Sequence, residues 1–175
     1  MRAHAAARTG ARPLVLGPLA PAHRERIREI VASTGVFRPS EVAVALEVFD
    51  DAFRPGQTDY ELVGAFDPED GTLLGYACYG PTPGTAGTWD VYWIAVAPAA
   101  QGRGVGTALW REVETRLRRR GARLCIVETS GSAHYKATRR FYARCGLTPV
   151  ATVPDYYDDG DDRVIYAKRL IPSNP

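Results

Sequence analysis

Three closely spaced glycines lie in the middle of the sequence, where an apolar run changes into a segment with helical periodicity. Gly102, Gly104 and Gly106 follow the apolar residues 93–100, and Arg103 lies among them. A glycine-containing turn at the start of a helix presents backbone N–H groups and the positive end of the helix dipole to an anion, typically a phosphate. The Gly-Lys-Ser/Thr ending of a Walker loop is absent, and so is the third glycine of a dinucleotide-binding pattern. Phosphate binding and a purely structural turn both remain open from these residues alone.

Three further side chains could transfer protons. Tyr142 carries an O–H group whose unperturbed pKa of about 10 is comparable to that of a thiol. Asp90 opens an apolar strand expected at residues 89–97, and Glu128 lies near the end of another strand expected at residues 124–129. Either carboxylate could accept a proton through a water molecule. The alternatives are a core tyrosine with a bonded hydroxyl and strand-end carboxylates that are satisfied by hydrogen bonds.

An acidic and aromatic segment, residues 155–162, lies close to the C-terminus. It contains Asp155, Tyr156 and Asp158, which could attract an ammonium-bearing substrate and offer it an aromatic face. Asp and Gly also favour ordinary turns, so a solvated turn is the alternative.

The cysteines and histidines give no sign of a metal site. Cys78, Cys125 and Cys145 could form a covalent acyl-cysteine, but burial in the core explains free cysteines better. Of the three histidines, His134 lies near the expected site and has no clustered partner in the sequence. An odd number of cysteines fits a reducing cytoplasm, and we expect a cytoplasmic protein without a metal.

The composition describes a globular chain. Of its 175 residues, 45% are hydrophobic and 24% are charged, which excludes a disordered or rod-like protein. No apolar stretch reaches the roughly 20 residues of a membrane helix, and a net charge of +2 does not favour nucleic acid as the partner. Residues 1–12 are expected to form a flexible tail, with a mitochondrial presequence as the alternative, and residues 13–171 a single domain.

Hydrophobic periodicity and turn residues predict the element order β-α-α-β-β-β-α-β-α-β-β. Strands are expected at residues 13–19, 60–66, 73–79, 89–97, 124–129, 148–154 and 163–170. Helices are expected at residues 21–32, after an N-cap at Ser40, and at residues 105–120 and 132–145. This order predicts an α/β fold with a mixed central sheet of about seven strands flanked by helices.

Two motifs resemble those of the GCN5-related N-acetyltransferase (GNAT) superfamily. Residues 101–106, Gln-Gly-Arg-Gly-Val-Gly, are similar to its Gln/Arg-x-x-Gly-x-Gly/Ala acetyl-CoA motif. Residues 141–147, Phe-Tyr-Ala-Arg-Cys-Gly-Leu, are similar to the Phe-Tyr-x-x-x-Gly-Phe signature of its fourth helix. The element order from residue 13 to residue 170 also matches.

The resemblance implies a coenzyme site and catalytic roles. Acetyl-CoA would bind between the strand that ends at Ala97 and the strand at residues 124–129. The residues implied in coenzyme binding are Ala95, Val96 and Ala97 for the pantetheine arm, and Gln101, Gly102, Arg103, Gly104, Val105, Gly106 and Thr107 for the pyrophosphate. Tyr135 stands where many members have Asn, which is a departure from the family's coenzyme contact. Tyr142 is implied as the general acid, and Asp90 matches the position of a catalytic glutamate in the histone-acetylating branch.

We therefore expect an N-acetyltransferase that moves an acetyl group from acetyl-CoA to a primary amine of a small molecule or peptide in a ternary complex. A non-catalytic acyl-CoA-binding or regulatory domain is the alternative. Neither a nucleic acid nor a membrane is an expected partner, and a homodimer remains open.

Overall fold

A computed structural model describes residues 13–170, which contain a seven-stranded sheet. The expected tail, residues 1–12, lies outside the described residues, and so does residue 171. The strands are β1 (Val15–Gly17), β2 (Glu61–Phe66), β3 (Leu73–Pro81), β4 (Thr88–Val96), β5 (Leu124–Ser130), β6 (Thr148–Asp158) and β7 (Asp161–Arg169). Their order across the sheet is β1-β2-β3-β4-β5-β7-β6, so the mixed α/β fold expected from the sequence is confirmed.

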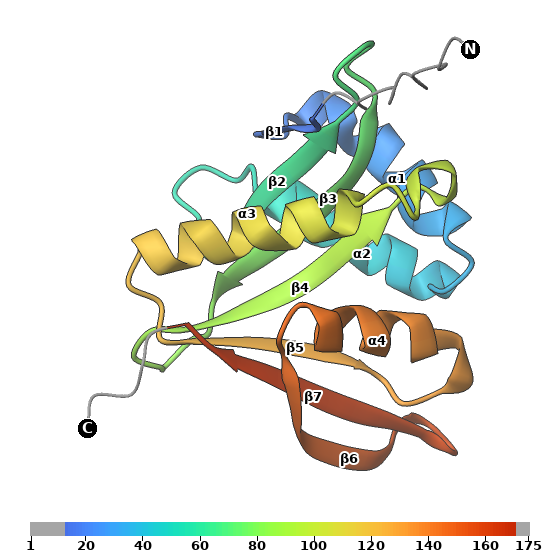
Figure 1. The fold of residues 1–175 in the computed structure, drawn as a ribbon, viewed down its shortest axis with the longest axis vertical. Helices are drawn as coiled ribbons and strands as arrows, with labels where there is room; N and C mark the ends of the chain where they lie inside the picture. The colour runs from blue at the N-terminus through green and yellow to red at the C-terminus, as the bar shows by residue number, and fades with distance from the viewer. Residues whose placement is uncertain (1–12, 171–175) are drawn as a thin grey trace, which may run out of the picture.

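The pairing of β4 with β5 is parallel and short, whereas all other neighbouring strands are antiparallel. Only three residues of each strand pair, Thr88 to Asp90 with Leu124 to Ile126. Beyond them the strands diverge toward the end of the sheet nearest α4 (Figure 1). The sheet therefore lacks backbone pairing between β4 and β5 beyond these three residues.

Within residues 13–170, four α-helices cover the two faces of the sheet (Figure 1). They are α1 (Arg24–Ser33), α2 (Pro39–Asp51), α3 (Val105–Arg119) and α4 (Lys136–Arg144), and three short 3₁₀ turns, Pro21–His23, Pro98–Ala100 and Ala133–Tyr135, precede α1, α3 and α4. Helix α3 crosses one face of the sheet, and α1 and α2 lie behind the opposite face. Within residues 13–170, no helix has the length and apolar character needed to cross a membrane.

Helix α3 buries one apolar stripe against the sheet. Its buried residues are Val105, Leu109, Trp110, Val113 and Leu117. They recur at helical spacing, as the sequence predicts, and Gly121 follows the helix with a left-handed φ of 71°. The stripe fixes the helix across the sheet, and with it the position of the glycine turn at its N-terminus.

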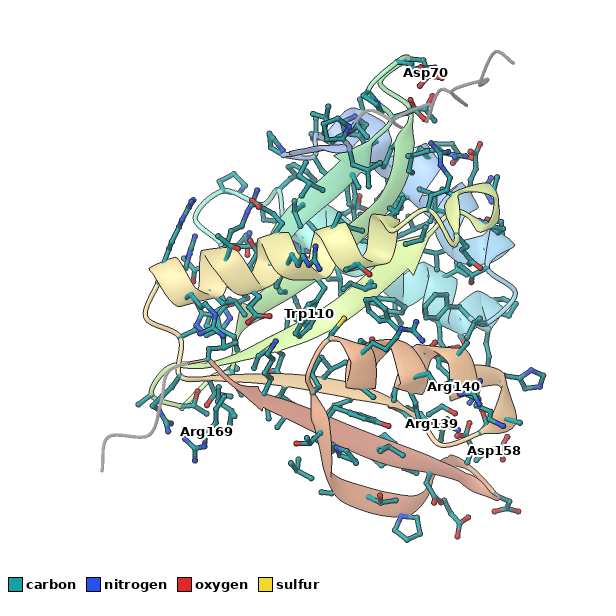
Figure 2. The ribbon with its side chains drawn as sticks, viewed as in Figure 1. Asp70, Trp110, Arg139, Arg140, Asp158 and Arg169 are labelled. Carbon is teal, nitrogen blue, oxygen red and sulfur yellow. The ribbon has the colours of Figure 1, made fainter. Side chains whose placement is uncertain are left out.

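Polar contacts between α4 and its neighbours hold both ends of the helix. Near its start, Arg139 donates from Nη1 to the carbonyl of Ser130, at 2.7 Å. At its C-terminus, Lys168 Nζ donates to the carbonyl of Cys145 at 2.7 Å and to Glu114 of α3 at 2.6 Å. Trp110, which Figure 2 shows between α3 and the strands, lies 5.8 Å from this ammonium. These contacts connect α4, α3 and β7 in one arrangement.

Two local expectations were wrong. The N-cap of α2 is Arg38 rather than Ser40, because Pro39 occupies the first helical position and Glu41 accepts the Arg38 N–H at 2.7 Å. The acidic segment is not an open turn, because β6 continues to Asp158 and β7 begins at Asp161. Only two residues connect these strands.

The apolar stripe of α3 generates a stability prediction. Leu109 has no exposed surface, so Leu109→Ala should lower the free energy of unfolding by about 2 to 5 kcal/mol through lost burial and a residual cavity. The matched control is Arg119→Ala, at the exposed end of the same helix, with an expected change within about 0.5 kcal/mol. Urea unfolding measures both. Equal losses in the two variants would contradict the packing of this helix.

Candidate active site

A cleft of about 1280 Å³ occupies the opening between β4 and β5. The segments that line it come from the N-terminus of α3, from α4, from the loop 34–38 between α1 and α2, and from the β6–β7 hairpin. The end of the β4–β5 pairing thus creates a cavity that helices and loops enclose.

One face of β5 is directed toward α3 and α4. Cys125 lies opposite Lys168 in the β5–β7 pairing, and Lys168 contacts Glu114 of α3 and the carbonyl of Cys145 at the end of α4. Thr129 lies on the same face by strand alternation. We call the part of the cleft that is lined by α3, α4 and this face the helix side.

Asp90 and Glu128 lie on the opposite face. Asp90 pairs with Ile126 where the two strands separate, and Glu128 follows Ile126 two residues later. Both carboxylates line the cleft together with the loop 34–38 and the β6–β7 hairpin. We call this part the carboxylate side. Because the opening in the sheet joins the two sides, a bound molecule can contact both.

A bulge in β4 shapes the strand beside the cleft. Tyr79 pairs with Val91 and Cys78 with Trp93, so Tyr92 is an extra residue on β4. Such a bulge bends a strand and changes the direction of its side chains. Tyr92 and Trp93 both line the cleft, although no sequence pattern distinguishes them as site residues.

The expected pantetheine segment lies only partly at the cleft. Ala95 and Val96 line it. Ala97 does not, and its N–H donates to the carbonyl of Leu74 at 2.8 Å. The backbone of Ala95 and Val96 is therefore the part of this segment that borders the cavity.

The glycine turn has the geometry of an anion site. Gly102 and Gly104 have left-handed φ values of 75° and 82°, and Gly104 is the N-cap of α3. A Cβ atom at either glycine would meet nothing within 4 Å, so the space beside the turn is open. The cleft-lining residues of this segment are Gln101, Gly102, Gly104, Val105, Gly106 and Thr107. The first N–H groups of a helix have no intrahelical acceptor and remain available to a ligand.

Arg103 is placed differently from the rest of the turn. It does not line the cleft, and its Nη2 lies 3.2 Å from Asp67 Oδ2 in an ion pair with the β2–β3 turn. The Arg103 guanidinium is therefore directed toward Asp67 in this structure.

Tyr142 lines the helix side of the cleft from α4. The residue is 6% exposed, and its ring centroid lies 6.0 Å from that of Tyr166. Burial raises the pKa of the Tyr142 hydroxyl well above its usual value, with smaller contributions from Cys145, Tyr135 and Cys125. The group is thus a protonated O–H donor at neutral pH.

Tyr135 lines the cleft, but its hydroxyl is engaged by the loop 34–38. It donates to the carbonyl of Val36 at 3.4 Å, and burial raises its pKa to about 12. Phe37 of the same loop contacts the Trp93 ring at 5.1 Å and the Tyr135 ring at 6.5 Å. These contacts enclose the cleft.

The two candidate carboxylates have different partners. Asp90 Oδ2 accepts a hydrogen bond from Thr82 Oγ1 at 2.6 Å. Glu128 Oε1 accepts from Arg163 Nη2 in an ion pair. Asp90 thus has a neutral hydroxyl as its partner, whereas Glu128 has a guanidinium.

The residues of the acidic segment differ in their position relative to the cleft. Asp155, Tyr156 and Asp158 do not line the cleft, whereas Tyr157 and Asp161 do. The β6–β7 pairing is interrupted between the pair Val153–Arg163 and the pair Asp158–Asp161, so regular alternation does not hold there. The carboxylate of Asp155 instead accepts the N–H of Gly160 at 2.8 Å. Figure 2 shows Asp158 near the tip of the hairpin.

Thr129 is a cleft residue that the sequence did not indicate. It is 5% exposed, and within residues 13–170 its hydroxyl has no hydrogen-bond partner. A threonine in a β-strand is unremarkable in sequence, since β-branched residues favour strands.

The cysteines lie in the core rather than at a reactive position. Cys78 and Cys125 are buried, and burial raises the pKa of Cys125 to about 12. Such a thiol is a poor nucleophile. Across residues 13–170, no three His, Cys, Asp or Glu side chains cluster as metal ligands would, although His134 lines the cleft.

Known proteins share this fold. A protein from Desulfovibrio desulfuricans that is assigned to the GNAT family of acetyltransferases has a solved structure with 42% identity and a TM-score of 0.84, over 91% of this chain and 100% of that one. The structure of an aminoglycoside 6'-N-acetyltransferase complexed with coenzyme A has a TM-score of 0.71 over 92% of this chain and 99% of that one. Its identity is 16%, so this likeness concerns the fold.

Sequence comparison gives the same family. The mycothiol acetyltransferase of Beutenbergia cavernae is 35% identical over 121 residues, which are 67% of this chain. The match spans 39% of that relative's length. The sequence pattern of the Acetyltransferase (GNAT) family matches residues 26–147, which contain the glycine turn, Asp90, Glu128 and Tyr142. The chain therefore belongs to the Acetyltransferase (GNAT) family.

Proposed function

We propose that this enzyme transfers an acetyl group from acetyl-CoA to a primary amine of a small molecule or peptide, by direct attack in a ternary complex. The supporting observation is the single cleft that reaches the glycine turn and Tyr142 on one side and Asp90 and Glu128 on the other. One cavity can therefore hold both substrates together. We further propose that residues 13–171 act as one domain.

The residues of the turn fit a coenzyme with a pyrophosphate. The free N–H groups at the start of α3 offer donors to an anion, and the open space beside Gly102 and Gly104 admits it. The backbone of Ala95 and Val96 would hold the pantetheine arm, with Tyr135 across the cleft. A structural relative at 16% identity is complexed with coenzyme A, which supports the same partner here. Acetyl-CoA would supply the acyl group as a thioester.

Tyr142 is proposed as the general acid. Attack by the amine nitrogen on the thioester carbonyl forms the C–N bond, and loss of the C–S bond leaves an electron pair on sulfur. Burial keeps the Tyr142 hydroxyl protonated, so it can donate a hydrogen bond to the sulfur as negative charge develops there. The hydroxyl then transfers its proton to sulfur, and the products are an N-acetyl compound and the free thiol.

Asp90 is proposed as the general base. It lies where β4 and β5 separate, and its Oδ1 is not used in the Thr82 hydrogen bond. The amine must lose a proton to become a nucleophile, and Asp90 would accept it directly or through a water molecule. Glu128 is the alternative base, although its ion pair with Arg163 favours a substrate-orienting role.

A non-catalytic acyl-CoA-binding domain is the alternative. Such a protein would need the glycine turn but would not need Tyr142 or the two carboxylates in the same cleft. Release of free CoA from acetyl-CoA on addition of amines would identify an enzyme, and its absence would favour the non-catalytic domain.

Acetyl-CoA should stabilise the wild-type protein and should not stabilise Gly104→Val. A ligand at a hundredfold excess over its Kd adds about 2.7 kcal/mol, which raises Tm by several degrees. Valine at Gly104 would enter the open space beside the turn and would oppose the left-handed φ of 82°. The control Gly56→Val has similar strain, at φ 78°, in a loop that does not line the cleft. A wild-type Tm that is insensitive to acetyl-CoA would contradict coenzyme binding.

Tyr142→Phe should lower kcat by roughly 10² to 10⁴ and leave the Kd for acetyl-CoA nearly unchanged, because only the transferable proton is lost. Tyr166→Phe, which alters the neighbouring ring outside the cleft, serves as the control. Since burial raises the pKa of Tyr142, its deprotonation should not produce an alkaline loss of kcat below about pH 10. Activity of Tyr142→Phe within a few-fold of wild type would make this residue a packing residue.

Asp90→Asn should reduce kcat/KM most strongly at low pH and recover partly at high pH, where the amine loses its proton without help. Glu128→Gln, the matched change, should mainly raise KM for the amine and keep the shape of the pH profile. Initial rates between pH 6 and 10 separate the two assignments. The reverse pattern would assign the base to Glu128.

A further inference from the structure

Arg163 lies on the carboxylate side of the cleft. Two neighbours hold its side chain in place, and within the described part of the chain some of its N–H groups remain free to bind a ligand. It lines the cleft from β7, and its side chain is 24% exposed. Glu128 accepts from Nη2, and the Tyr156 ring covers the guanidinium, with its centroid 4.6 Å from Cζ. An arginine fixed in this way presents its remaining donors in a planar fork without the entropy cost of ordering a free side chain.

One buried donor of Arg163 has no partner. Its Nε is buried, and within residues 13–170 it makes no hydrogen bond. Glu128 accepts from Nη2, and because Arg163 lines the cleft, the terminal N–H groups that Glu128 does not use are available to a ligand there. Since an N–H group can only donate, such a ligand must supply an acceptor, and a guanidinium fits the two oxygens of a carboxylate best.

The charges of the carboxylate side are mixed rather than uniformly acidic. Asp161 lies 3.9 Å from Arg38, and Glu128 is paired with Arg163. Asp90 has no lysine or arginine partner among the described residues. This arrangement offers an unpaired anion to an ammonium group and cationic donors to an anionic group. A simple amine would use only the first of these.

We propose that the acceptor is an amino acid, whose carboxylate is bound by Arg163 while its amine lies toward Asp90. The inference rests on the proposed N-acetyltransferase function and narrows its acceptor from amines in general to those with a nearby carboxylate. The spacing agrees. Asp90 is level with Ile126, and Glu128, which holds Arg163, lies one strand repeat of about 6 to 7 Å further along β5. The two charged groups of a small amino acid can span this region. Tyr156 is then a positioning residue that acts through Arg163.

The first test measures binding, without turnover. Wild-type protein saturated with CoA is titrated calorimetrically with L-phenylalanine and L-leucine, and with the amide and the decarboxylated amine of each. We expect at least one amino acid to bind about tenfold or more tightly than its amide and its amine, since a charge-assisted hydrogen bond is lost in both analogues. Equal binding of acid, amide and amine, or no binding by any of the acids, would overturn the proposal.

Variants of Arg163 test whether this residue is the cause. Arg163→Met should abolish the preference for the acid over the amide, Arg163→Lys should keep part of it, and Tyr156→Leu should weaken it with the protein still folded, because Tyr156 is 52% exposed. Arg119→Met, on the exposed end of α3, is the matched control. An unchanged preference in Arg163→Met, with a wild-type melting curve, would show that Arg163 only balances the charge of Glu128.

Turnover separates this inference from the proposed function. Release of CoA in the presence of amino acids, and not of their amides, would support both the N-acetyltransferase function and amino acid recognition. Release with amides or simple amines at equal or higher kcat/KM keeps the N-acetyltransferase function and overturns amino acid recognition. Selective binding of amino acids with no CoA release from acetyl-CoA would support Arg163 as a carboxylate site and contradict the proposed function.

Discussion

The early end of the pairing between β4 and β5 is the constraint on which the site depends. Only Thr88 to Asp90 pair with Leu124 to Ile126, so the strands have unpaired edges over the rest of their length. Unpaired backbone N–H and C=O groups inside a protein require partners. A coenzyme with amide groups in its pantetheine arm is a suitable partner, and the cleft that results is lined by residues from both faces of the sheet.

The position of α4 follows from a few polar contacts rather than from extensive packing on the sheet. Arg139 holds the start of the helix to Ser130, and Lys168 holds its end through the carbonyl of Cys145. Tyr142 lies between these two contacts and packs on Tyr166. The hydroxyl proposed as the acid is therefore placed by residues of β5 and β7 that are distant in sequence.

The elements could be predicted from the sequence because their signals are local. The stripe of α3 and the glycine turn follow from periodicity and φ requirements within one segment. The hairpin side chains could not be assigned in the same way, because the interruption of the β6–β7 pairing changes which of them face the cleft. Arg163 and Thr129 gave no signal either, since their importance depends on hydrogen-bond partners that only the folded chain provides or lacks. Local patterns thus specified the strands, the helices and the glycine turn, and long-range contacts determined the rest of the candidate site.

The division of the cleft by the sheet has an evolutionary consequence. The helix side comes from α3, α4 and one face of β5, whereas the carboxylate side comes from the loop 34–38, the hairpin and the other face. Substitutions at distant positions without shared partners have nearly additive effects. Changes in the hairpin, and changes in the loop that keep its contacts with Tyr135, would therefore alter the acceptor region while the glycine turn stays the same. The fold thus builds the proposed acetyl-CoA site and the proposed acceptor site from largely different elements, so that the second can change while the first is kept.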